Sequence, residues 1–559
     1  MAAIVSSNFR SLNAQNFKED VTSPGSNVYL GLGKPSAWSN TLTSTVDGTP
    51  AIPTDTIDGV NQARANLLGL KIISNSDISH VCPRYNWAAQ ETFVAWDSND
   101  VDIFERAFYC LTPDFKVYKC LFSPGTAVSD VPTKTQTDPF KTVDNYVWKY
   151  MYTILAADSE RFLTTSYMPV KNLPEKVQVT VPSTTSAATT IFISEENPDL
   201  LVGMQALTTD AYHENNTNIT LTGSPKITAI DGTKITLSSN IATATTNVVV
   251  TFSDFETTNV LYPQQQVQKA SRASATAGGI ERIVIGSDLK GSTASFGSGY
   301  TSSPTITIAG DGTGATFSST ITLNSDAVSN LSYYVRDDSG VAGVNYTVAN
   351  VNVVGGGGSG AVARAVIAPG AGHGTNPVQE LGGFYIAINA QISGATDSAD
   401  IVNTQDFRQI LLLKNPLSST GLKLDSTTLN GTPYLKASTG SSGGLDLLNT
   451  AALTGDPIIT GAGGAKAYVV AVDTQNEYIY YHQNANTGYG TFVASEAITA
   501  DVGTTAIDLS GNAIALLGSS FNIDAEFDTG SGEILFLENR DPIQRSSSQI
   551  EDVKLIIEF

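Results

Sequence analysis

The stretch DNYVWKYMYTI, residues 144–154, alternates aromatic and other side chains in a way that indicates the fold class. Tyr146, Trp148, Tyr150 and Tyr152 occupy every second position, which predicts an extended strand with all four rings on one face. Such a row can stack on a sugar or a base, or it can pack in a core or a subunit interface. Regular alternation over four positions favours packing.

Similar strand patterns recur elsewhere, whereas helical patterns are scarce. Residues 407–416 (FRQILLLKNP) and 532–542 (GEILFLENRDP) are apolar runs that end in turn residues, and the chain closes on QIEDVKLIIEF, residues 549–559. Helical periodicity is best over residues 60–70, with Asp58 as a possible cap, and one further turn is expected near DSERFL. We therefore expect a mainly β, multi-domain, β-sandwich-like scaffold with few short helices and inserted small β modules.

The composition limits the classes of partner. The chain has 559 residues, which is enough for several cores, and its formal net charge is −22. A field of this sign repels nucleic acid and anionic lipid, so we expect neither nucleic-acid binding nor membrane insertion. Charged residues make up only 15% of the chain, and a polar but uncharged surface suits extended β-structure or permanent contact with other subunits.

The three cysteines and the chain start carry little signal for export. Cys110 and Cys120 lie where they could face each other across a hairpin, and the sequence leaves open whether they pair, although an odd count favours buried free thiols. The first residues lack a charged segment followed by an apolar core, so no signal peptide is expected. No apolar run approaches the length of a membrane span.

An internal repeat lies in the Gly- and Thr-rich part of the chain. GYTSSPTITIAGDGTGATFSSTI begins at Gly299 and NYTVANVNVVGGGGSGAVARAVI begins at Asn345, so the offset is 46 throughout. Each copy contains a tyrosine, a strand, a glycine turn and a second strand. The pattern predicts a small β module duplicated in tandem.

Shifts in composition divide the chain into six segments. A second Gly-, Ala- and Thr-rich region contains two strand patterns that could pair as a hairpin through Asp473–Glu477. The predicted segments are the first part of the scaffold (1–185), an inserted β region (186–275), the repeat module (276–375), a scaffold continuation (376–437), a second inserted β module (438–530) and C-terminal scaffold strands (531–559).

The stretch VYLGLGKPSAW, residues 28–38, resembles a phosphate-binding loop but fails the test on residue identity. A loop of the form G-x-x-x-x-G-K-[ST] would need glycine where Val28 stands and a hydroxyl where Pro35 stands. A dinucleotide-binding turn would need glycine in place of Ser36. We interpret Gly31 and Gly33 as the residues that let the strand turn sharply.

No catalytic, cofactor-binding or metal-binding residue can be nominated. The four histidines are far apart in the sequence, whereas a zinc site uses clustered ligands. No nucleophile-elbow motif is present, and the acidic stretches lack the alternating ligands of a calcium loop. We therefore expect no cofactor and no enzymatic activity.

An ordered set of motifs resembles one known family. The set begins with NFR (8–10), GLGKPSAWSN (31–40), PTDTIDGV (53–60) and CPRYNW (82–87), continues with VYKCL (117–121) and the strand at 144–154, and closes with DFRQILLLKNPL (406–417) and FLENRDPI (536–543). This set is similar to the baseplate wedge subunit of T-even-like contractile-tailed bacteriophages, the subunit present as a dimer in each wedge. The resemblance covers about 1–180, 380–435 and 530–559, so the two Gly/Thr-rich regions are extra insertions.

The resemblance implies a structural virion protein of the contractile tail, made late in the host cytoplasm and located in the tail baseplate. It implies a homodimer that connects other wedge subunits, namely the long scaffold subunit, the fork-forming subunit and the subunit that links to the short tail fibres, with tail fibres as a further candidate partner. It also implies a part in tail assembly and in transmitting host attachment to contraction. The candidate structural and interface residues are Trp38, Trp87, Tyr146, Trp148, Tyr150, Arg408, Asn539 and Arg540.

Two other functions remain open at the sequence level. The insertions suit a glycan-binding adhesin, which would contact fibres or host glycans. A tail-associated polysaccharide hydrolase would need a carboxylate pair at a set separation in a cleft lined with aromatics.

Overall fold

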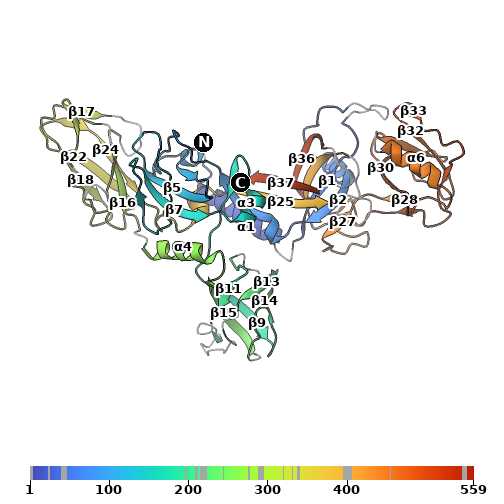
Figure 1. Ribbon diagram of the computed structural model, residues 1–559, viewed down its shortest axis with the longest axis horizontal. Coiled ribbons are helices and arrows are strands. Elements are labelled where there is room, and N and C mark those ends of the chain that lie inside the picture. The colour runs from blue at the N-terminus through green and yellow to red at the C-terminus, as the bar shows by residue number, and fades with distance from the viewer. Residues whose placement is uncertain are drawn as a thin grey trace. The chain divides into compact units, whose positions relative to one another are not determined.

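The computed structural model describes 4–22, 26–38, 47–194, 197, 199–207, 212–213, 223, 225–242, 245–274, 277–287, 295–318, 320–329, 332–335, 340–393, 406–452, 455–543 and 550–559. The chain is mainly β, with many small antiparallel sheets and few helices, as the strand patterns predict (Figure 1). It divides into two compact units, each built from separate segments. Unit 1 comprises 1–16, 79–387 and 556–559, and unit 2 comprises 17–78 and 388–555.

The scaffold part of unit 1 contains an aromatic-rich antiparallel sheet in the order β4-β5-β7-β6. Its members are β4 (Tyr109–Leu111), β5 (Lys116–Phe122), β7 (Val147–Thr153) and β6 (Phe140–Lys141). A second sheet has the order β37-β25-β3-β8. Its members are β3 (Ile78–Pro83), β8 (Tyr167–Pro169), β25 (Tyr385–Ser393) and β37 (Ile550–Glu558).

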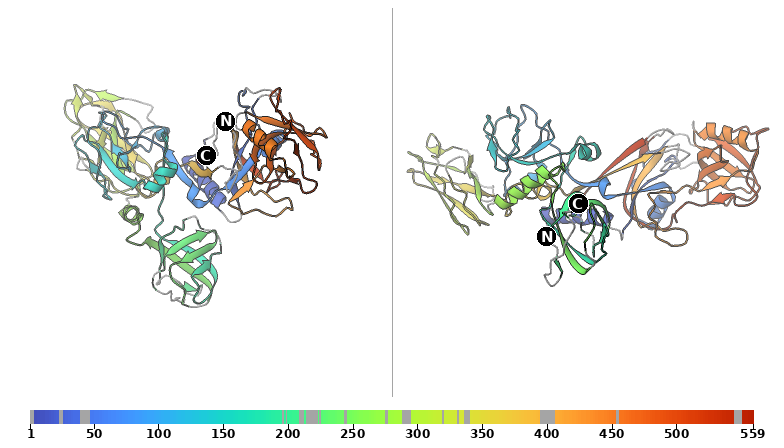
Figure 2. Two further views of the ribbon diagram at one scale, coloured as in Figure 1. Left: turned by 45° about the vertical axis from the view of Figure 1, so that its right-hand side comes forward. Right: turned by 60° about the horizontal axis from the view of Figure 1, so that its bottom comes forward.

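Strands β9–β15 and β16–β24 of unit 1 form two further groups, visible as the green and yellow ribbons of Figures 1 and 2. The first group comprises β9 (Val177–Thr184), β10 (Thr190–Phe192), β11 (Met204–Ala206), β12 (Tyr212–His213), β13 (Ile227–Asp231), β14 (Lys234–Leu237) and β15 (Thr245–Phe255). All of these strands except β12 contribute to one hydrophobic core. The second group is the repeat module, whose main sheet has the order β18-β22-β24-β16-β21. It comprises β16 (Ile280–Ile285), β17 (Phe296–Ser298), β18 (Thr305–Gly310), β19 (Leu323–Asn324), β20 (Ala327–Val328), β21 (Ser332–Tyr334), β22 (Ala349–Val354), β23 (Ser359–Ala361) and β24 (Ala363–Ile367).

Unit 2 contains a five-stranded sheet, here called the scaffold sheet, and an eight-stranded module. The scaffold sheet has the order β27-β2-β1-β26-β36 and comprises β1 (Val28–Gly33), β2 (Leu67–Ile72), β26 (Phe407–Lys414), β27 (Thr428–Asn430) and β36 (Glu533–Ile543). The module is an eight-stranded sheet of β28 (Tyr434–Lys436), β29 (Pro457–Gly461), β30 (Lys466–Asp473), β31 (Tyr478–His482), β32 (Ala497–Val502), β33 (Thr505–Ala506), β34 (Ile514–Ala515) and β35 (Asn522–Ile523). The predicted hairpin through Asp473–Glu477 is confirmed by the pairing of β30 with β31.

The described helices are α1 (Ser7–Thr22), α2 (Ile57–Ala65), α3 (Ala156–Phe162), α4 (Tyr262–Ser274), α5 (Pro377–Glu380) and α6 (Ser442–Ala452), with short 3-10 turns η1 (Asn75–Asp77) and η2 (Ile103–Glu105). The turn expected near DSERFL is α3. The helix expected over residues 60–70 is wrong in extent, because α2 is capped by the Thr56 hydroxyl and the apolar run after it forms β2. Here tertiary pairing overrides helical periodicity.

The sequence did not reveal α4, because the buried face of this helix is polar. Gln265, Gln268 and Ser271 are buried at a spacing of three residues. The side-chain amide of Gln265 accepts from the Phe255 backbone N–H and donates to the Pro174 carbonyl, and Gln268 accepts from the Leu173 N–H. Hydrogen bonds therefore replace the apolar stripe that a sequence pattern detects.

The predicted aromatic row is correct for three of its four members. Tyr146, Trp148 and Tyr150 pack in one buried cluster, but Tyr152 packs in another cluster together with Met151. The ladder between β5 and β7 skips Met151, so this extra residue forms a bulge. A bulge reverses which face the following side chain occupies, and this reversal separates Tyr152 from the row.

The interpretation of Gly31 and Gly33 as turn residues is wrong. Both lie inside β1, and the positive φ that turns the chain belongs to Lys34, at 60°. A Cβ at Gly31 would stand 2.7 Å from the Leu67 side chain, and one at Gly33 would stand 2.8 Å from the Asn66 carbonyl oxygen. The glycines therefore permit close packing.

The expectation that GEILFLENRDP ends in a turn before its proline is also wrong. Strand β36 continues through Pro542 to Ile543. This strand lies at the edge of its sheet, and its register with β26 shifts between the Phe407 and Gln409 pairs. An edge strand with an irregular register tolerates a proline that a central strand would not.

The two copies of the repeat form one interlocked body instead of two tandem modules. β18 of the first copy pairs antiparallel with β22 of the second, and both repeat tyrosines lie in the same core. A Cβ at Gly358 would stand 2.5 Å from the Tyr300 ring, and a Cβ at Gly312 would stand 2.5 Å from the Tyr346 ring. Each copy thus supplies the glycine against which the tyrosine of the other copy packs.

This packing predicts a large difference between two Gly→Ala substitutions. In Gly358→Ala the new methyl group overlaps the Tyr300 ring, and we expect a loss of about 1–3 kcal/mol in the stability of the module. Gly370 has no atom within 4 Å of an added Cβ, so Gly370→Ala should change stability by less than about 0.5 kcal/mol. Hydrogen exchange of the β18 and β22 amides measures both, and equal protection in the two variants would contradict the interlock.

Candidate functional site

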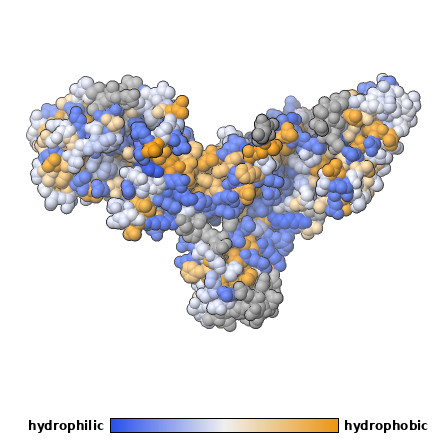
Figure 3. All heavy atoms as spheres, turned by 180° about the vertical axis from the view of Figure 1, so that it is seen from behind, coloured by the Kyte–Doolittle hydropathy of each residue, from blue (hydrophilic) through white to orange (hydrophobic). Residues whose placement is uncertain are grey.

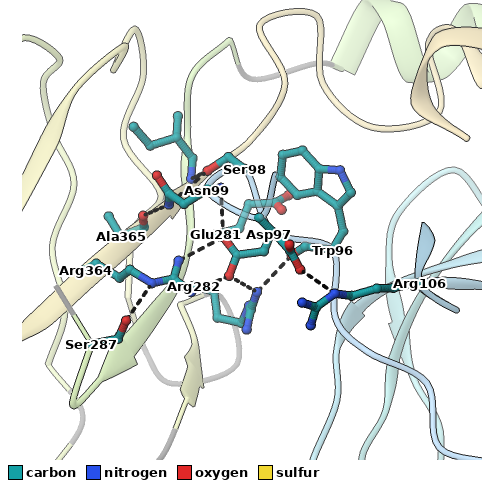
Figure 4. A network of polar contacts seen from close by, with 12 residues as sticks. Trp96, Asp97, Ser98, Asn99, Arg106, Glu281, Arg282, Ser287, Arg364 and Ala365 are labelled. Carbon is teal, nitrogen blue, oxygen red and sulfur yellow. Dashed lines mark hydrogen bonds and ion pairs between the residues drawn. The ribbon is translucent and has the colours of Figure 1, made fainter. Parts of the chain in front are cut away.

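The loop from Trp96 to Asn99 joins the scaffold of unit 1 to the repeat module through a buried carboxylate. Asp97 accepts two hydrogen bonds from the Arg364 guanidinium, at 2.8 and 2.6 Å, and one from Arg282 at 3.3 Å. Figure 4 shows the two arginines, from β24 and β16, converging on this loop. Asp97, Arg282 and Arg364, here called the Asp97 cluster, form a charge-assisted contact with bidentate geometry.

The two arginines of the Asp97 cluster hold its carboxylate in the ionised form. Burial alone would raise the pKa of Asp97, but the hydrogen bond from Arg364 and the positive charges of Arg282 and Arg364 lower it below its usual value. Burial lowers the pKa of Arg282, and the charge of Asp97 opposes this effect. The carboxylate is therefore ionised and is held by two cations.

Backbone contacts extend the attachment along the same loop. The Asn99 side-chain amide donates to the Ala365 carbonyl oxygen at 3.2 Å, and the Ile367 backbone N–H donates to the Ser98 hydroxyl at 3.2 Å. Arg282 also donates to the Trp96 carbonyl oxygen at 2.9 Å. The loop thus contacts both β16 and β24, and its position relative to the module is fixed at several points (Figure 4).

A second buried network, here called the Lys119 cluster, packs against the Trp96 ring. Lys119 Nζ is 3.0 Å from Glu380 Oε2 and 2.8 Å from His373 Nδ1, and His373 Nε2 is 2.7 Å from Glu281 Oε2. The Lys119 ammonium also lies 4.6 Å from the centre of the Trp96 ring. Glu281 precedes Arg282 on β16, so the two clusters are adjacent along that strand.

Glu380 is the main hydrogen-bond acceptor of the Lys119 cluster. Its carboxylate accepts from the backbone N–H groups of Gly374, Thr375 and Asn376, at distances from 2.8 to 3.2 Å. Burial would raise the pKa of Glu380, but the charge of Lys119 and the hydrogen bond from His373 lower it well below its usual range. A carboxyl group with a depressed pKa cannot act as a general acid at neutral pH.

Stability should depend on pH through these two carboxylates. Because the pKa values of Asp97 and Glu380 are lower in the folded state, their stabilising effect is fully present above the unfolded-state values of about 4 and is lost as the pH falls through the folded-state values. We expect the melting temperature to fall below pH 5, and to fall less steeply in Glu380→Gln. Calorimetry from pH 6 to pH 3 measures this, and parallel curves would contradict it.

A third cluster lies within unit 2, around Arg408 on β26. Arg408 donates to the Asp47 carboxylate at 2.6 Å, to the Pro35 carbonyl oxygen at 2.5 Å and to Asp406 at 3.3 Å. Asp47 also accepts from the Trp38 backbone N–H at 2.9 Å. The residues after the β1 strand are thereby bound to the scaffold sheet.

The glycine-lysine stretch takes part in this packing. Lys34 Nζ donates to the Ser36 hydroxyl at 2.7 Å and to the Ala37 carbonyl oxygen at 3.2 Å. Burial lowers the pKa of Lys34 to about 8, with a further contribution from Arg408. The ammonium group is engaged by its own turn.

Comparison with known proteins identifies the first quarter of the chain. Residues 3–137 match the family model described as Bacteriophage T4, Gp8. This region is similar to the phage Gp8 family. The baseplate wedge protein gp8 of Enterobacteria phage T4 is 25% identical over 202 residues, which is 30% of this chain and 60% of that protein. The matched part therefore spans less than two thirds of the T4 protein, and the resemblance to a baseplate wedge subunit is confirmed.

The Asp97 and Lys119 clusters each combine residues inside the Gp8 match with residues outside it. Asp97 and Lys119 lie inside the matched region, whereas Arg282, Arg364 and Glu380 lie beyond it. The two buried clusters of unit 1 thus connect Gp8-like sequence to sequence that the family model does not cover. No sequence motif marks these residues, since they come from segments that are far apart along the chain.

The predicted site residues fall into two groups. Tyr146, Trp148 and Tyr150 are buried in the scaffold core of unit 1, and Trp87 is half-buried against the same cluster. The protein itself therefore buries three of these rings and partly covers the fourth. Cys110 and Cys120 belong to this core as well, and all three cysteines are free and buried.

The other four predicted residues gather in unit 2. The Trp38 indole donates to the Arg540 carbonyl oxygen at 3.0 Å. The Asn539 side-chain amide donates to the Ala51 carbonyl oxygen at 2.9 Å and accepts from Gln409 at 2.8 Å. Together with Arg408, they attach the segment after β1 to strands β26 and β36, although Trp38 is more than 350 residues from each of the other three in the sequence.

The described residues contain no group of three or more His, Cys, Asp or Glu side chains placed to hold a metal ion. None of the helices in the described part of the chain has the length and hydrophobicity that crossing a bilayer requires.

Proposed function

We propose that this protein is a structural component of a phage tail baseplate wedge, where it acts as a homodimeric connector between other wedge subunits. The observation that carries the proposal is the match of residues 3–137 to the Gp8 family. The T4 relative is named a baseplate wedge protein, and the similarity to it covers 60% of its length. The protein takes part in baseplate assembly and in transmitting host attachment to tail contraction.

The buried contacts inside unit 1 are consistent with a protein that transmits force. A connector must keep its own modules in register while its neighbours move, which requires contacts that are specific and costly to break. The Asp97 and Lys119 clusters are buried ion pairs, and removing one partner from such a pair leaves an uncompensated charge. Glu380 is held as a carboxylate by Lys119 and backbone N–H groups, which supports a structural part for this cluster over a catalytic one.

Uncovered apolar residues support contact with other subunits. The exposed large hydrophobic residues include Ile4, Val5, Phe9 and Leu12 at the start of the chain. On the face shown in Figure 3, orange hydrophobic areas interrupt the hydrophilic surface. Wedge subunits, and tail fibres where they reach the baseplate, are the partners for such surfaces.

Locating the protein in the virion tests this function. Purified tails and isolated baseplates should contain the chain in a fixed ratio to the other wedge proteins by quantitative mass spectrometry, and particles that lack it should lack complete baseplates by electron microscopy. Absence of the chain from the tail would overturn the proposal. Release of sugar from host envelope glycans by the purified protein would favour the hydrolase instead.

A further inference from the structure

Unit 1 contains a pocket beside the Lys119 cluster. Its volume is about 490 Å³, which lies in the range of about 300–1,000 Å³ that small-ligand pockets occupy. Its walls come from the start of α1, the loop at Trp96, the turn η2, the end of α4 and the segment from Pro369 to Glu380. Every residue that lines the pocket belongs to unit 1, so the pocket lies within one unit.

Two partly exposed aromatic rings line this pocket, those of Trp96 and Phe104. The Lys119 ammonium lies 4.6 Å from the centre of the Trp96 ring, and the His373 ring lies nearly perpendicular to it at a centroid distance of 4.8 Å. The Phe104 ring meets the Phe384 ring edge to face at 5.6 Å. Both rings are thus held in place by the protein, which lowers the entropy cost of binding a ligand against them.

The charged groups of the pocket wall are already engaged by the protein. Lys119 donates to Glu380, and Glu380 accepts from three backbone N–H groups as well. Arg272 donates to the Asn172 side-chain oxygen at 2.9 Å and to the Leu173 carbonyl oxygen at 2.8 Å. An anionic ligand would have to break these bonds and enter a chain with a net charge of −22. The wall therefore favours a ligand without charge.

Side-chain amides supply most of the other polar groups. Asn8 and Gln379 are exposed, and Asn376 lies at the start of α5. An amide both donates and accepts hydrogen bonds, as a sugar hydroxyl does. An extended peptide would instead use free backbone groups of the wall, but the N–H groups of residues 374–376 already bond to Glu380. The wall thus fits hydroxyl groups better than a peptide backbone.

We propose that this pocket binds a neutral sugar ring. The apolar C–H face of the ring packs on Trp96 or Phe104, because the face of an aromatic ring carries partial negative charge that attracts C–H groups. The hydroxyls of the ring bond to the amides of Asn8 and Gln379. The inference goes beyond the proposed function and does not depend on it, since a wedge connector requires no sugar site.

Saturation-transfer NMR of the full chain with glucose, galactose and N-acetylglucosamine tests the inference. We expect transfer to the ring C–H protons of at least one of these sugars, with a dissociation constant on the order of 1 mM. Glucuronate differs from glucose by a carboxylate and should bind more weakly. Absence of transfer to all three neutral sugars overturns the inference, and tighter binding of glucuronate than of glucose also overturns it.

Two variants locate the bound sugar. Gly370 lines the pocket, and a Cβ added there meets no atom within 4 Å, so Gly370→Phe should fold and place a ring in the pocket. We expect it to weaken sugar binding roughly tenfold or more. The double variant Asn8→Ala, Gln379→Ala changes two exposed side chains and should weaken binding by a similar factor. Circular dichroism verifies the fold of each variant.

Asn61→Ala is the matched control. Asn61 is an exposed amide on α2 and does not line the pocket, so its substitution should leave sugar binding unchanged. Binding that is unaltered in Gly370→Phe and in the double variant overturns the inference, as does an equal loss in Asn61→Ala. Each of these outcomes leaves the baseplate role standing, because that role is judged separately by mass spectrometry of tails.

Discussion

Asp97→Ala should loosen the repeat module from the scaffold of unit 1 more than a surface charge substitution does. The substitution leaves Arg282 and Arg364 buried without their carboxylate, at exposed fractions of 9% and 12%. Breaking a buried pair in this way costs about 3–5 kcal/mol. We expect amides of β16 and β24 to exchange faster by a factor corresponding to that loss, measured by hydrogen exchange with mass spectrometry.

A control and a rescue make this prediction specific. Asp100 pairs with the half-exposed Arg106 on the same loop, so Asp100→Ala should cost about 1 kcal/mol or less. Adding Arg282→Met and Arg364→Met to Asp97→Leu removes the unpaired charges and should recover most of the protection, since apolar replacement of a whole buried ion group is often neutral. If the triple variant is as unstable as Asp97→Ala, unpaired charge is not the cause.

Glu380→Ala should have a similarly large effect by a different mechanism. It removes the partner of Lys119, which is 1% exposed, and it also removes the acceptor for three backbone N–H groups before α5. We expect a loss of about 3–5 kcal/mol from the buried charge alone. Thermal unfolding monitored by Trp96 fluorescence, in a chain whose other tryptophans are replaced by phenylalanine, measures it.

Adding Lys119→Met distinguishes the two mechanisms. In Glu380→Ala with Lys119→Met the unpaired cation is gone, but the N–H groups of Gly374, Thr375 and Asn376 still lack an acceptor, and each costs about 1–3 kcal/mol. Rescue should therefore be only partial, unlike the rescue at Asp97. Gln379→Ala, at an exposed position of the same helix, should change stability by less than about 0.5 kcal/mol. Full rescue by Lys119→Met would contradict the backbone-acceptor part of this account.

The strands were predictable where the local pattern was strong. The strand at 144–154, the apolar run at 407–416 and the chain end form β7, β26 and β37. The pattern could not show the bulge at Met151, because a bulge depends on the partner strand. It also missed α4, whose buried glutamines satisfy backbone groups of distant segments.

The candidate residues also divide into those that the sequence could nominate and those that only the structure revealed. Trp38, Arg408 and Asn539 were nominated from motifs, and the structure brings them together, whereas Tyr146 and Trp148 lie in the core. The Asp97 cluster was missed. Isolated charges such as Arg282 and Arg364 look like ordinary surface residues until their burial is known.

By itself, the sequence determined the β class, the repeat and the Gp8-like region. Alternating side chains, internal similarity and the order of motifs can all be recognised along the chain without knowledge of which distant segments meet. Only the tertiary structure decided that the repeats interlock and that Asp97 meets Arg282 and Arg364, which are 185 and 267 residues away along the chain. The physical reason is that pairing between distant charges depends on how sheets connect in space, and no local pattern of side chains encodes that connection.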